Sequence, residues 1–230
     1  MNVKEQYVRT AAVIGGDAFN KLKSAKIAIF GVGGVGGAVC EALARAGIGR
    51  IDIFDGDTVA ESNINRQIIA LHSTVGRDKV EVMRERILDI NPECDVRANK
   101  VFYLPSNADE YPLEKYDYIA DAIDTVVAKV ELAVRAERLG VPMIAAMGAG
   151  NKLDPTKFEV ADIYKTQVCP LAKVMRRELK ARGVKHLKCV YSTEVSVKTE
   201  GGLVGSMPHV PTAAGFIIAG EIIRDIIRDF

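Results

Sequence analysis

Short apolar runs alternate with amphipathic segments along the first 150 residues of the chain. The runs have the length of buried strands, and we expect five of them, at residues 26–30, 50–55, 96–102, 116–124 and 141–148. Between the runs, apolar positions such as Val80, Met83, Ile87 and Ile90 recur every three or four residues, which predicts helices. The helices are expected after the first strand as far as Gly47, over 76–92 and over 125–140. This alternation is typical of a parallel sheet covered by helices.

The alternation breaks after residue 150. Residues 153–167 indicate an extended crossover, and residues 170–183 a short basic helix. Residues 187–198 predict a long strand with a hairpin partner near 201–207. A last helix is expected from about Thr212. Its apolar surface, formed by Ile217, Ile218, Ile222 and Ile226, suits core packing or a dimer interface better than a membrane.

Composition limits the class of protein. The chain has 230 residues, of which 48% are hydrophobic, and a formal net charge of +1, so we expect a globular protein without a strong overall charge preference. Its four cysteines, Cys40, Cys94, Cys169 and Cys189, form no C-x-x-C pair, which argues against a structural zinc site. The N-terminal region has no apolar signal-peptide core, and the longest apolar stretch, 213–223, is too short to span a bilayer. We therefore expect a cytoplasmic protein with reduced cysteines and no transmembrane segment.

A glycine-rich run, GVGGVGG at residues 31–37, lies between the first predicted strand and the first predicted helix. Gly31, Gly33 and Gly36 have the spacing G-x-G-x-x-G, which allows a tight turn and lets a helix N-terminus offer its N–H groups to a phosphate. Asp55 follows at the end of the second strand, where a carboxylate commonly binds a ribose. The sequence therefore predicts a nucleotide site at this turn.

These features together define the expected fold. It is of the α/β class, with a Rossmann-like, mainly parallel sheet, flanking helices and a mixed arrangement at the C-terminal end. We find no domain boundary in the sequence. We therefore expect one nucleotide-binding domain over residues 1–230, with a basic crossover insertion at about 154–188.

The residues after Asp55 distinguish between two kinds of nucleotide. An NAD-dependent dehydrogenase fits the glycine run equally well, because a dinucleotide carries about two negative charges, which the turn and the helix dipole can balance. ATP carries about four, and arginine and lysine side chains commonly balance the excess. Arg66, Gln67, Lys79 and Arg9 supply donors of this kind. Each alone is typical of a solvated surface, but together on one edge of the sheet they favour a triphosphate.

The fourth predicted strand ends in two acidic residues, Asp121 and Asp124. They fall at the edge where parallel sheets bind ligands, and a carboxylate there can hold a Mg²⁺ ion that bridges phosphates. Asp124 also has an alternative structural role as the N-cap of the next helix. Both roles are open for Asp124, and the metal role is the weaker hypothesis for Asp121.

Longer motifs resemble the ubiquitin-activating-enzyme superfamily, whose bacterial members adenylate carboxylates. They are GVGGVGG, FDGDTVAESNINRQ, TVGRDKVEVMRERILDINPE and DAIDT. Four further runs are similar to one branch of it, the tRNA threonylcarbamoyladenosine dehydratases: INRQIIALHSTVG, MGAGNKLDP, KTQVCPLAKVMRRELKARGVK and YSTE. The resemblance covers about residues 7–223 and implies ATP and Mg²⁺ as ligands.

The resemblance also implies a set of site residues. ATP would be bound by Gly31, Gly33, Gly34 and Gly36, with the ribose on Asp55, the triphosphate near Asn63, Arg66 and Lys79, and Gln67 beside them. Asp124 matches an aspartate linked to magnesium. Arg9 matches an arginine that relatives insert into the active site of the partner subunit, which implies a homodimer. Arg66, Lys79, Asp124 and Arg9 are thus the candidate catalytic residues.

The reaction implied by the resemblance is the ATP-dependent cyclisation of threonylcarbamoyl-adenosine beside the tRNA anticodon, with net loss of water. The substrate's own ureido group would close the ring, so no covalent enzyme intermediate is required. One alternative is an adenylyltransferase that activates the C-terminal glycine of a small ubiquitin-like sulfur-carrier protein. Cys169 lies where such relatives carry a nucleophilic cysteine, although the paired C-x-x-C motifs of many of them are absent. Another alternative is a non-catalytic dimeric scaffold that binds nucleotide.

A basic segment supports a tRNA partner. The candidate tRNA-binding residues are Lys173, Arg176, Arg177, Lys180, Arg182 and Lys185. A basic helix can neutralise several backbone phosphates, although charged runs are more often solvated helix faces. The segment has no interleaved aromatic residues and so gives no indication of base stacking. A sulfur-relay protein is a second candidate partner.

Overall fold

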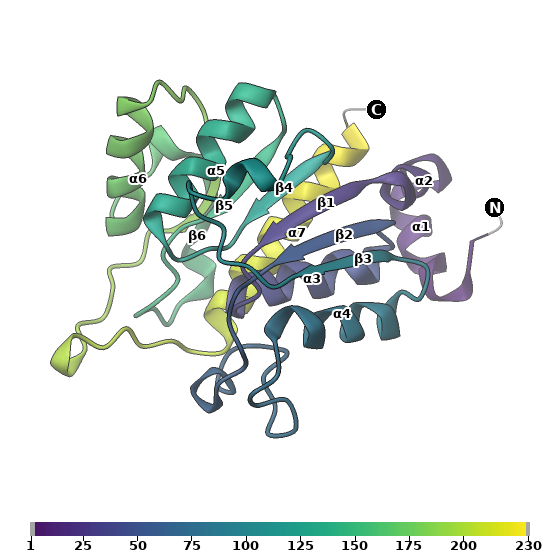
Figure 1. Ribbon diagram of the computed structural model, residues 1–230, viewed down its shortest axis with the longest axis horizontal. Coiled ribbons are helices and arrows are strands. Elements are labelled where there is room, and N and C mark those ends of the chain that lie inside the picture. Colours follow the sequence, from purple (N-terminus) through teal and green to yellow (C-terminus); the bar gives the residue numbers. More distant parts are fainter. Residues whose placement is uncertain (1–2, 229–230) are drawn as a thin grey trace.

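The computed structural model describes residues 3–228, and its centre is a seven-stranded sheet (Figure 1). In chain order the strands are β1 Lys26–Phe30, β2 Arg50–Phe54, β3 Asp95–Asn99, β4 Tyr118–Asp121, β5 Met143–Ala146, β6 Phe158–Asp162 and β7 Lys188–Ser192. They lie in the order β3-β2-β1-β4-β5-β7-β6, and every neighbouring pair is parallel except β6 and β7. The prediction of a mainly parallel sheet with a mixed C-terminal end is confirmed.

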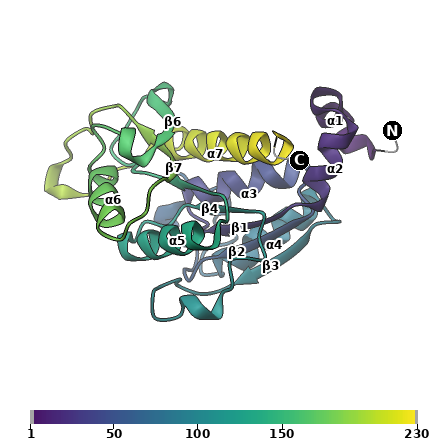
Figure 2. The same ribbon diagram turned by 90° about the horizontal axis from the view of Figure 1, so that it is seen from above.

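Helices cover both faces of this sheet (Figure 2). They are α1 Val8–Ile14, α2 Gly16–Ser24, α3 Gly34–Ala46, α4 Lys79–Ile90, α5 Val126–Leu139, α6 Pro170–Ala181 and α7 His209–Arg228. Single 3-10 turns occur at Glu5–Tyr7, Glu61–Asn63, Ala108–Glu110, Pro155–Lys157, Ile163–Lys165 and Glu200–Gly202. Helices α3, α4 and α7 pack on one face, and α5 and α6 on the other. Within residues 3–228, none of these helices combines the length and hydropathy needed to cross a membrane.

Strand β1 shows why the buried strands appear in the sequence as continuous apolar runs. Ile27 and Ile29 belong to the core beneath α3, α4 and α7, whereas Ala28 and Phe30 belong to the core beneath α5 and α6. All four side chains are fully buried. Successive residues of a strand point to opposite faces, so a central strand with helices on both sides is apolar at every position.

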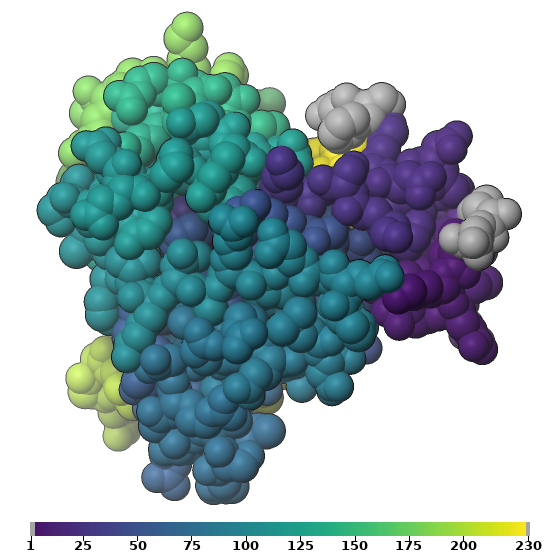
Figure 3. Space-filling model, turned by 45° about the vertical axis from the view of Figure 1, so that its right-hand side comes forward, coloured from purple at the N-terminus to yellow at the C-terminus, as the bar shows by residue number. Residues whose placement is uncertain are grey.

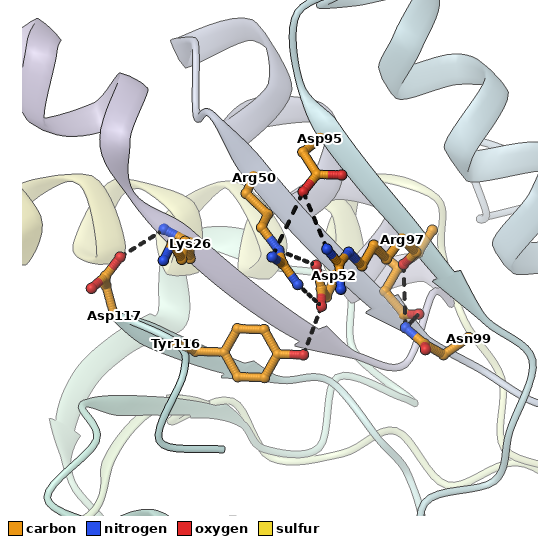
Figure 4. A network of polar contacts seen from close by, with 9 residues as sticks. Lys26, Arg50, Asp52, Asp95, Arg97, Asn99, Tyr116 and Asp117 are labelled. Atoms are coloured by element: carbon orange, nitrogen blue, oxygen red, sulfur yellow. Dashed lines mark hydrogen bonds and ion pairs between the residues drawn. The ribbon is translucent and has the colours of Figure 1, made fainter. Parts of the chain in front are cut away.

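Strand β2 carries one buried charge within this apolar pattern. The Asp52 carboxylate is 1% exposed. It accepts hydrogen bonds from Arg50 Nε at 2.8 Å, from Arg50 Nη2 at 2.9 Å and from the Tyr116 hydroxyl at 2.8 Å (Figure 4). Burial and the adjacent Asp52 carboxylate raise the pKa of Tyr116, so the phenol stays a donor. This network joins β2 to the segment that leads into β4.

The C-terminal half differs from the predicted elements. The strand expected over 187–198 ends at Ser192, and its partners are β5 and β6, whereas residues 201–207 form no strand. Because β5 and β6 occupy both edges of β7, no edge remains for a hairpin. The expected extended crossover contains β6, and α7 begins at His209 rather than near Thr212. The apolar pattern in 193–207 thus belongs to an irregular segment, in which Val195, Leu203 and Val204 are exposed.

The N-terminal region forms two helices, to which the sequence pattern gave no assignment. Tyr7, Ala11 and Phe19 make a small core of their own, and the rings of Tyr7 and Phe19 lie 5.2 Å apart. In the space-filling view the purple N-terminal residues stand out at one side of the body (Figure 3). Since α2 leads directly into the start of β1, these helices lie at the amino ends of the strands.

We expect Tyr116→Phe to lower the free energy of unfolding by about 1.5–3 kcal/mol, because it removes a hydrogen bond to a buried carboxylate. Tyr103→Phe is the matched control. The Tyr103 hydroxyl is buried without a hydrogen-bond partner among the described residues, so its removal should leave stability unchanged or raise it. Urea unfolding of both variants measures the difference. An equal loss in the two variants would contradict the role of the Asp52 network.

Candidate functional site

A cavity of about 870 Å³ lies at the carboxyl ends of β1, β2 and β4. Its volume is in the range of small-molecule sites. Its walls include eight of the residues predicted from the sequence, Gly31, Gly33, Gly34, Asp55, Arg66, Gln67, Lys79 and Asp124. The sheet therefore brings together side chains that are up to about 90 positions apart in the chain, since the carboxyl ends of parallel strands meet at one edge.

The glycine turn connects β1 to α3 in a conformation that side chains would block. Gly31 has φ +88°, and a Cβ there would lie 2.6 Å from the Ala122 carbonyl oxygen. A Cβ at Gly36 would lie 1.8 Å from the Gly31 oxygen. Gly33 is the N-cap of α3, and the only neighbour of a Cβ there would be the Gln67 amide, 3.8 Å away. The N-terminus of α3 thus meets the cavity along bare backbone, an arrangement that suits a phosphate.

Asp55 is held at the cavity wall by two backbone donors. Its Oδ2 accepts from the Val32 N–H at 2.7 Å, and its Oδ1 accepts from the Asp57 N–H at 2.9 Å. A carboxylate has about four acceptor positions. The fixed Asp55 side chain therefore retains acceptor capacity for ligand hydroxyl groups.

Donors line the cavity beside the glycine turn. The Lys79 side chain is buried, and its Nζ lies 2.7 Å from Asp57 Oδ2. Arg66 Nη1 donates to the Ser62 carbonyl and to Asn65 Oδ1, both at 2.9 Å. Gln67 is 7% exposed, and its Oε1 has no hydrogen-bond partner within residues 3–228. A buried polar atom without a partner at a cavity wall indicates a ligand group that completes the site.

The two aspartates after β4 have different surroundings. Asp124 is exposed at the cavity, and its only hydrogen bond in the described structure comes from Thr125 Oγ1 at 3.2 Å. Thr125, not Asp124, is the N-cap of α5, so the alternative capping role of Asp124 is wrong. Asp121 is fully buried 2.8 Å from Lys129 Nζ and is not free to bind a metal.

A magnesium ion fits this site as a ligand of Asp124 together with a nucleotide. Among residues 3–228, no group of three or more His, Cys, Asp or Glu side chains is arranged to hold a metal ion. Mg²⁺ commonly uses one or two carboxylates and takes its other ligands from phosphates and water. A single free carboxylate beside an anion-binding turn is consistent with that pattern.

Comparison with known proteins shows the family of this chain. The sequence matches the ThiF family over residues 7–229. The chain belongs to the ThiF family.

Two ThiF-type proteins resemble the chain over most of its length. A tRNA threonylcarbamoyladenosine dehydratase of Bacillus subtilis (strain 168) is 40% identical, and the match covers 97% of this chain and 95% of the relative. The crystal structure of the Escherichia coli tRNA N6-threonylcarbamoyladenosine dehydratase in complex with ATP has a TM-score of 0.92 and 38% identity, covering 97% of this chain and 94% of that one. An AMP complex of the same enzyme is equally similar.

A relative with another activity matches a smaller part of the chain. An adenylyltransferase and sulfurtransferase of Vanderwaltozyma polyspora is 40% identical over 57% of this chain and 30% of its own length. The similarity to this adenylyltransferase and sulfurtransferase is therefore partial, whereas the similarity to the B. subtilis dehydratase extends over nearly the whole chain.

Three residues implied by the resemblance to this family lie outside the cavity walls. Asn63 Oδ1 accepts from the Ala60 N–H at 3.0 Å and holds a local turn. Gly36 lies in the first turn of α3, against the Gly31 carbonyl and the Ala122 side chain. Arg9 is exposed on α1, at the opposite end of the strands from the cavity. Arg9 therefore does not reach the cavity of its own chain.

Two parts of the cavity wall had no signal in the sequence analysis. Phe102, 61% exposed, lies against Gly56, where a Cβ would be 2.6 Å from the phenylalanine ring. The irregular segment after β7 contributes Val204, Gly205 and Ser206. It is tied down by Asn65 Nδ2, which donates to the Ser206 carbonyl at 2.9 Å, and by Asn151 Oδ1, which accepts from the Gly205 N–H at 2.5 Å.

The predicted basic face on α6 is only partly free. Arg176 is half-buried and donates to the Thr166 carbonyl at 2.9 Å and to the Thr166 hydroxyl. Arg177 and Arg182 both pair with Glu178, each at 2.8 Å. Lys173, Lys180 and Lys185 are exposed, and the side chain of none of them has an ion pair within residues 3–228. These three lysines form the free basic surface of this region.

The cysteines are all buried, including Cys169, which is 2% exposed at the start of α6. Burial raises the pKa of Cys94 and of Cys189 to about 12 and also raises the pKa of Cys40. A nucleophilic cysteine needs an accessible thiolate. The surroundings of Cys169 therefore resemble those of a structural cysteine.

We expect all four thiols to react slowly with a thiol-specific disulfide reagent in the folded protein and rapidly after denaturation, because each side chain is buried. The rate at which the reagent releases its chromophore, with and without denaturant, measures how accessible the thiols are. If one thiol reacts fast, the Cys169→Ser variant shows whether that thiol is Cys169. Rapid reaction of one thiol that disappears in Cys169→Ser would contradict the structural role.

Proposed function

We propose that this protein is an ATP-dependent tRNA-modifying enzyme. It activates the carboxylate of threonylcarbamoyl-adenosine next to the anticodon and cyclises it with net dehydration. The observation that carries this proposal is the match to the B. subtilis dehydratase over 97% of this chain. The partial match to the sulfur-carrier activator makes the alternative reaction the weaker hypothesis.

The cavity has the groups that ATP requires. The bare backbone at Gly31, Gly33 and Gly34 receives phosphate oxygens, and Asp55 accepts hydrogen bonds from the ribose. Arg66 and Lys79 add full positive charges beside the turn, and Asp57 fixes the Lys79 ammonium at the cavity wall. Gln67 supplies an amide whose oxygen still lacks a partner.

Magnesium would be held by Asp124 and by the phosphates. When bound, it would neutralise part of the phosphate charge. The protein's own contribution is the placement of the Asp124 carboxylate at the cavity, on the connection that lies against the glycine turn. The site thus combines a carboxylate for the metal with cationic side chains for the nucleotide.

The chemistry then depends on how charge moves during carboxylate activation. Attack of the threonyl carboxylate on ATP moves negative charge onto the departing phosphate group, which Arg66 and Lys79 stabilise. The activated carboxyl group is attacked by the ureido group of the same substrate. The ring closes, the leaving group departs, and the net change is the loss of one water. Since the nucleophile is internal, its effective concentration is high and no enzyme thiol is needed.

Two further interactions belong to the proposal. Lys173, Lys180 and Lys185 bind tRNA backbone phosphates, supported by their exposure and lack of ion-pair partners in the described structure. Arg9 acts in trans within a homodimer, supported by its distance from the cavity of its own chain. We also expect the protein to act in the cytoplasm, where its tRNA substrate is found.

The proposed reaction predicts that incubation with ATP, Mg²⁺ and tRNA containing threonylcarbamoyl-adenosine converts that nucleoside to a product lighter by one water. Mass spectrometry of the tRNA nucleosides measures it. Arg66→Ala and Lys79→Ala should lower kcat by about 100-fold or more, because each removes a charge that acts on the departing phosphate. An unchanged nucleoside together with adenylation of a sulfur-carrier protein would favour the alternative.

The proposed tRNA surface predicts that the double variant Lys173→Glu, Lys180→Glu binds tRNA more weakly. The slope of the logarithm of the binding constant against the logarithm of the salt concentration should become shallower by about one to two. The control Lys23→Glu, Lys115→Glu makes the same change of net charge at the amino ends of the strands. Filter binding at several salt concentrations gives both values. The same affinity and slope in all three proteins would exclude α6 from the tRNA interface.

A further inference from the structure

A fully buried ion pair lies beneath the cavity. Lys129 on α5 and Asp121 at the end of β4 are both 0% exposed, and Lys129 Nζ lies 2.8 Å from Asp121 Oδ2. Neither side chain lines the cavity. The chemistry described above makes no use of them.

The pair holds the connection between β4 and α5 from below. Asp121 Oδ1 accepts from the Ile123 N–H at 3.1 Å, and Lys129 Nζ donates to the Ile123 carbonyl at 3.2 Å. The backbone N–H and the backbone carbonyl of Ile123 are therefore both hydrogen-bonded to the pair. The connection consists of residues 122–125, all of which line the cavity, and it carries Asp124.

Other contacts fix the two ends of this connection. Ala122 is tied to β1, since its N–H donates to the Phe30 carbonyl at 2.8 Å. At the other end, the carbonyl of Thr125, the N-cap of α5, accepts from the Lys129 N–H at 3.1 Å. Between these two points Ile123 packs against the core beneath α5 and α6, and within the described residues the side-chain hydrogen bonds to its backbone are those of Asp121 and Lys129.

Stability alone does not account for the pair. Replacing a buried ion pair with apolar side chains of similar volume is often neutral or stabilising, by about 1–4 kcal/mol. Lys129 also places a cation in the first turns of a helix, where the helix dipole disfavours it. The protein nevertheless has a buried ion pair and a cation near a helix N-terminus directly below the cavity.

We propose that Asp121 and Lys129 are a positioning pair, which holds residues 122–125 so that Asp124 meets the metal–nucleotide complex. The pair acts through the backbone of Ile123 and does not touch the ligands. This inference rests on the proposed function, because it assigns the pair to the site at which ATP would bind. Geometry of this kind matters, since a displacement of about 1 Å at a reacting centre can lower a rate about 100-fold.

The test replaces the pair with apolar residues. In Asp121→Leu, Lys129→Met the buried charges are removed together, so no unpaired charge remains. The matched control is Arg50→Met, Asp52→Leu, which removes the buried ion pair of β2 (Figure 4), with Asp52 1% exposed. Asp121→Asn, Lys129→Met is a second variant for use if the first does not fold, because it also leaves no unpaired buried charge and its amide oxygen keeps an acceptor for the Ile123 N–H.

We expect faster amide hydrogen exchange at residues 122–125 of the pair variant, measured without ATP or metal, and no such change in the control. With substrates, kcat should fall about 10- to 100-fold. The Mg²⁺ concentration for half-maximal rate should rise, and ATP affinity without metal should stay close to that of the unmodified protein. Asp121→Asn, Lys129→Met should show smaller changes of the same kind, because it keeps an acceptor for the Ile123 N–H.

Unchanged exchange at residues 122–125 and unchanged kcat in a folded pair variant would overturn the inference. Equal effects in the control would also overturn it, because they would indicate a general loss of stability. Failure of the proposed function is a separate result, seen when the unmodified protein does not dehydrate the tRNA nucleoside. The exchange measurement on the protein alone decides the role of the pair in that case as well.

Discussion

The proposed function depends on one electrostatic requirement: the negative charge of a polyphosphate has to be balanced where β1 turns into α3. A helix N-terminus supplies about half a positive charge, which is less than a triphosphate needs. Arg66 and Lys79 line the same cavity, and in the proposed function they supply the remainder. Such cations would distinguish a site that cleaves ATP from a site that only holds a dinucleotide.

The parallel sheet makes this concentration of charge possible. Strands β1, β2 and β4 are buried on both faces, so their carboxyl ends are fixed, and the segments that follow them converge. Two polar contacts support the site: Asp57, at the cavity wall, pairs with Lys79, and the buried Lys129–Asp121 pair binds the connection that carries Asp124. The cavity thus combines functional groups at its wall with polar partners that orient them.

Much of this could be predicted from the sequence, because burial on two faces leaves an unmistakable apolar run. Strands β1, β2, β4 and β5 were predicted in that way, and the glycine turn and Asp55 from their positions at the ends of the first two strands. Strand β3, at the edge of the sheet, is only partly buried, yet its position was also predicted. The segment 193–207 was not, because its alternating valines resemble a strand although β7 has no free edge. Which strands pair with each other depends on the whole sheet and not on the local sequence pattern of one segment.

Individual site residues were harder to predict, since their roles depend on neighbours distant in the chain. Arg176 belongs to the basic segment by sequence, but in space it binds Thr166. Cys169 appears at a helix start, yet its sulfur is buried. Phe102 and the Val204–Ser206 wall gave no signal, because an exposed apolar residue acquires meaning only from the cavity that it borders.

The central claim is that cationic side chains converge on the triphosphate of ATP at the glycine turn. A crystal structure with a non-hydrolysable ATP analogue and Mg²⁺ tests it most directly. The account predicts hydrogen bonds from Arg66 and Lys79 to the phosphates beyond the first, with Asp124 at the metal. Arg66 and Lys79 directed away from a bound nucleotide whose outer phosphates touch no protein cation would contradict it.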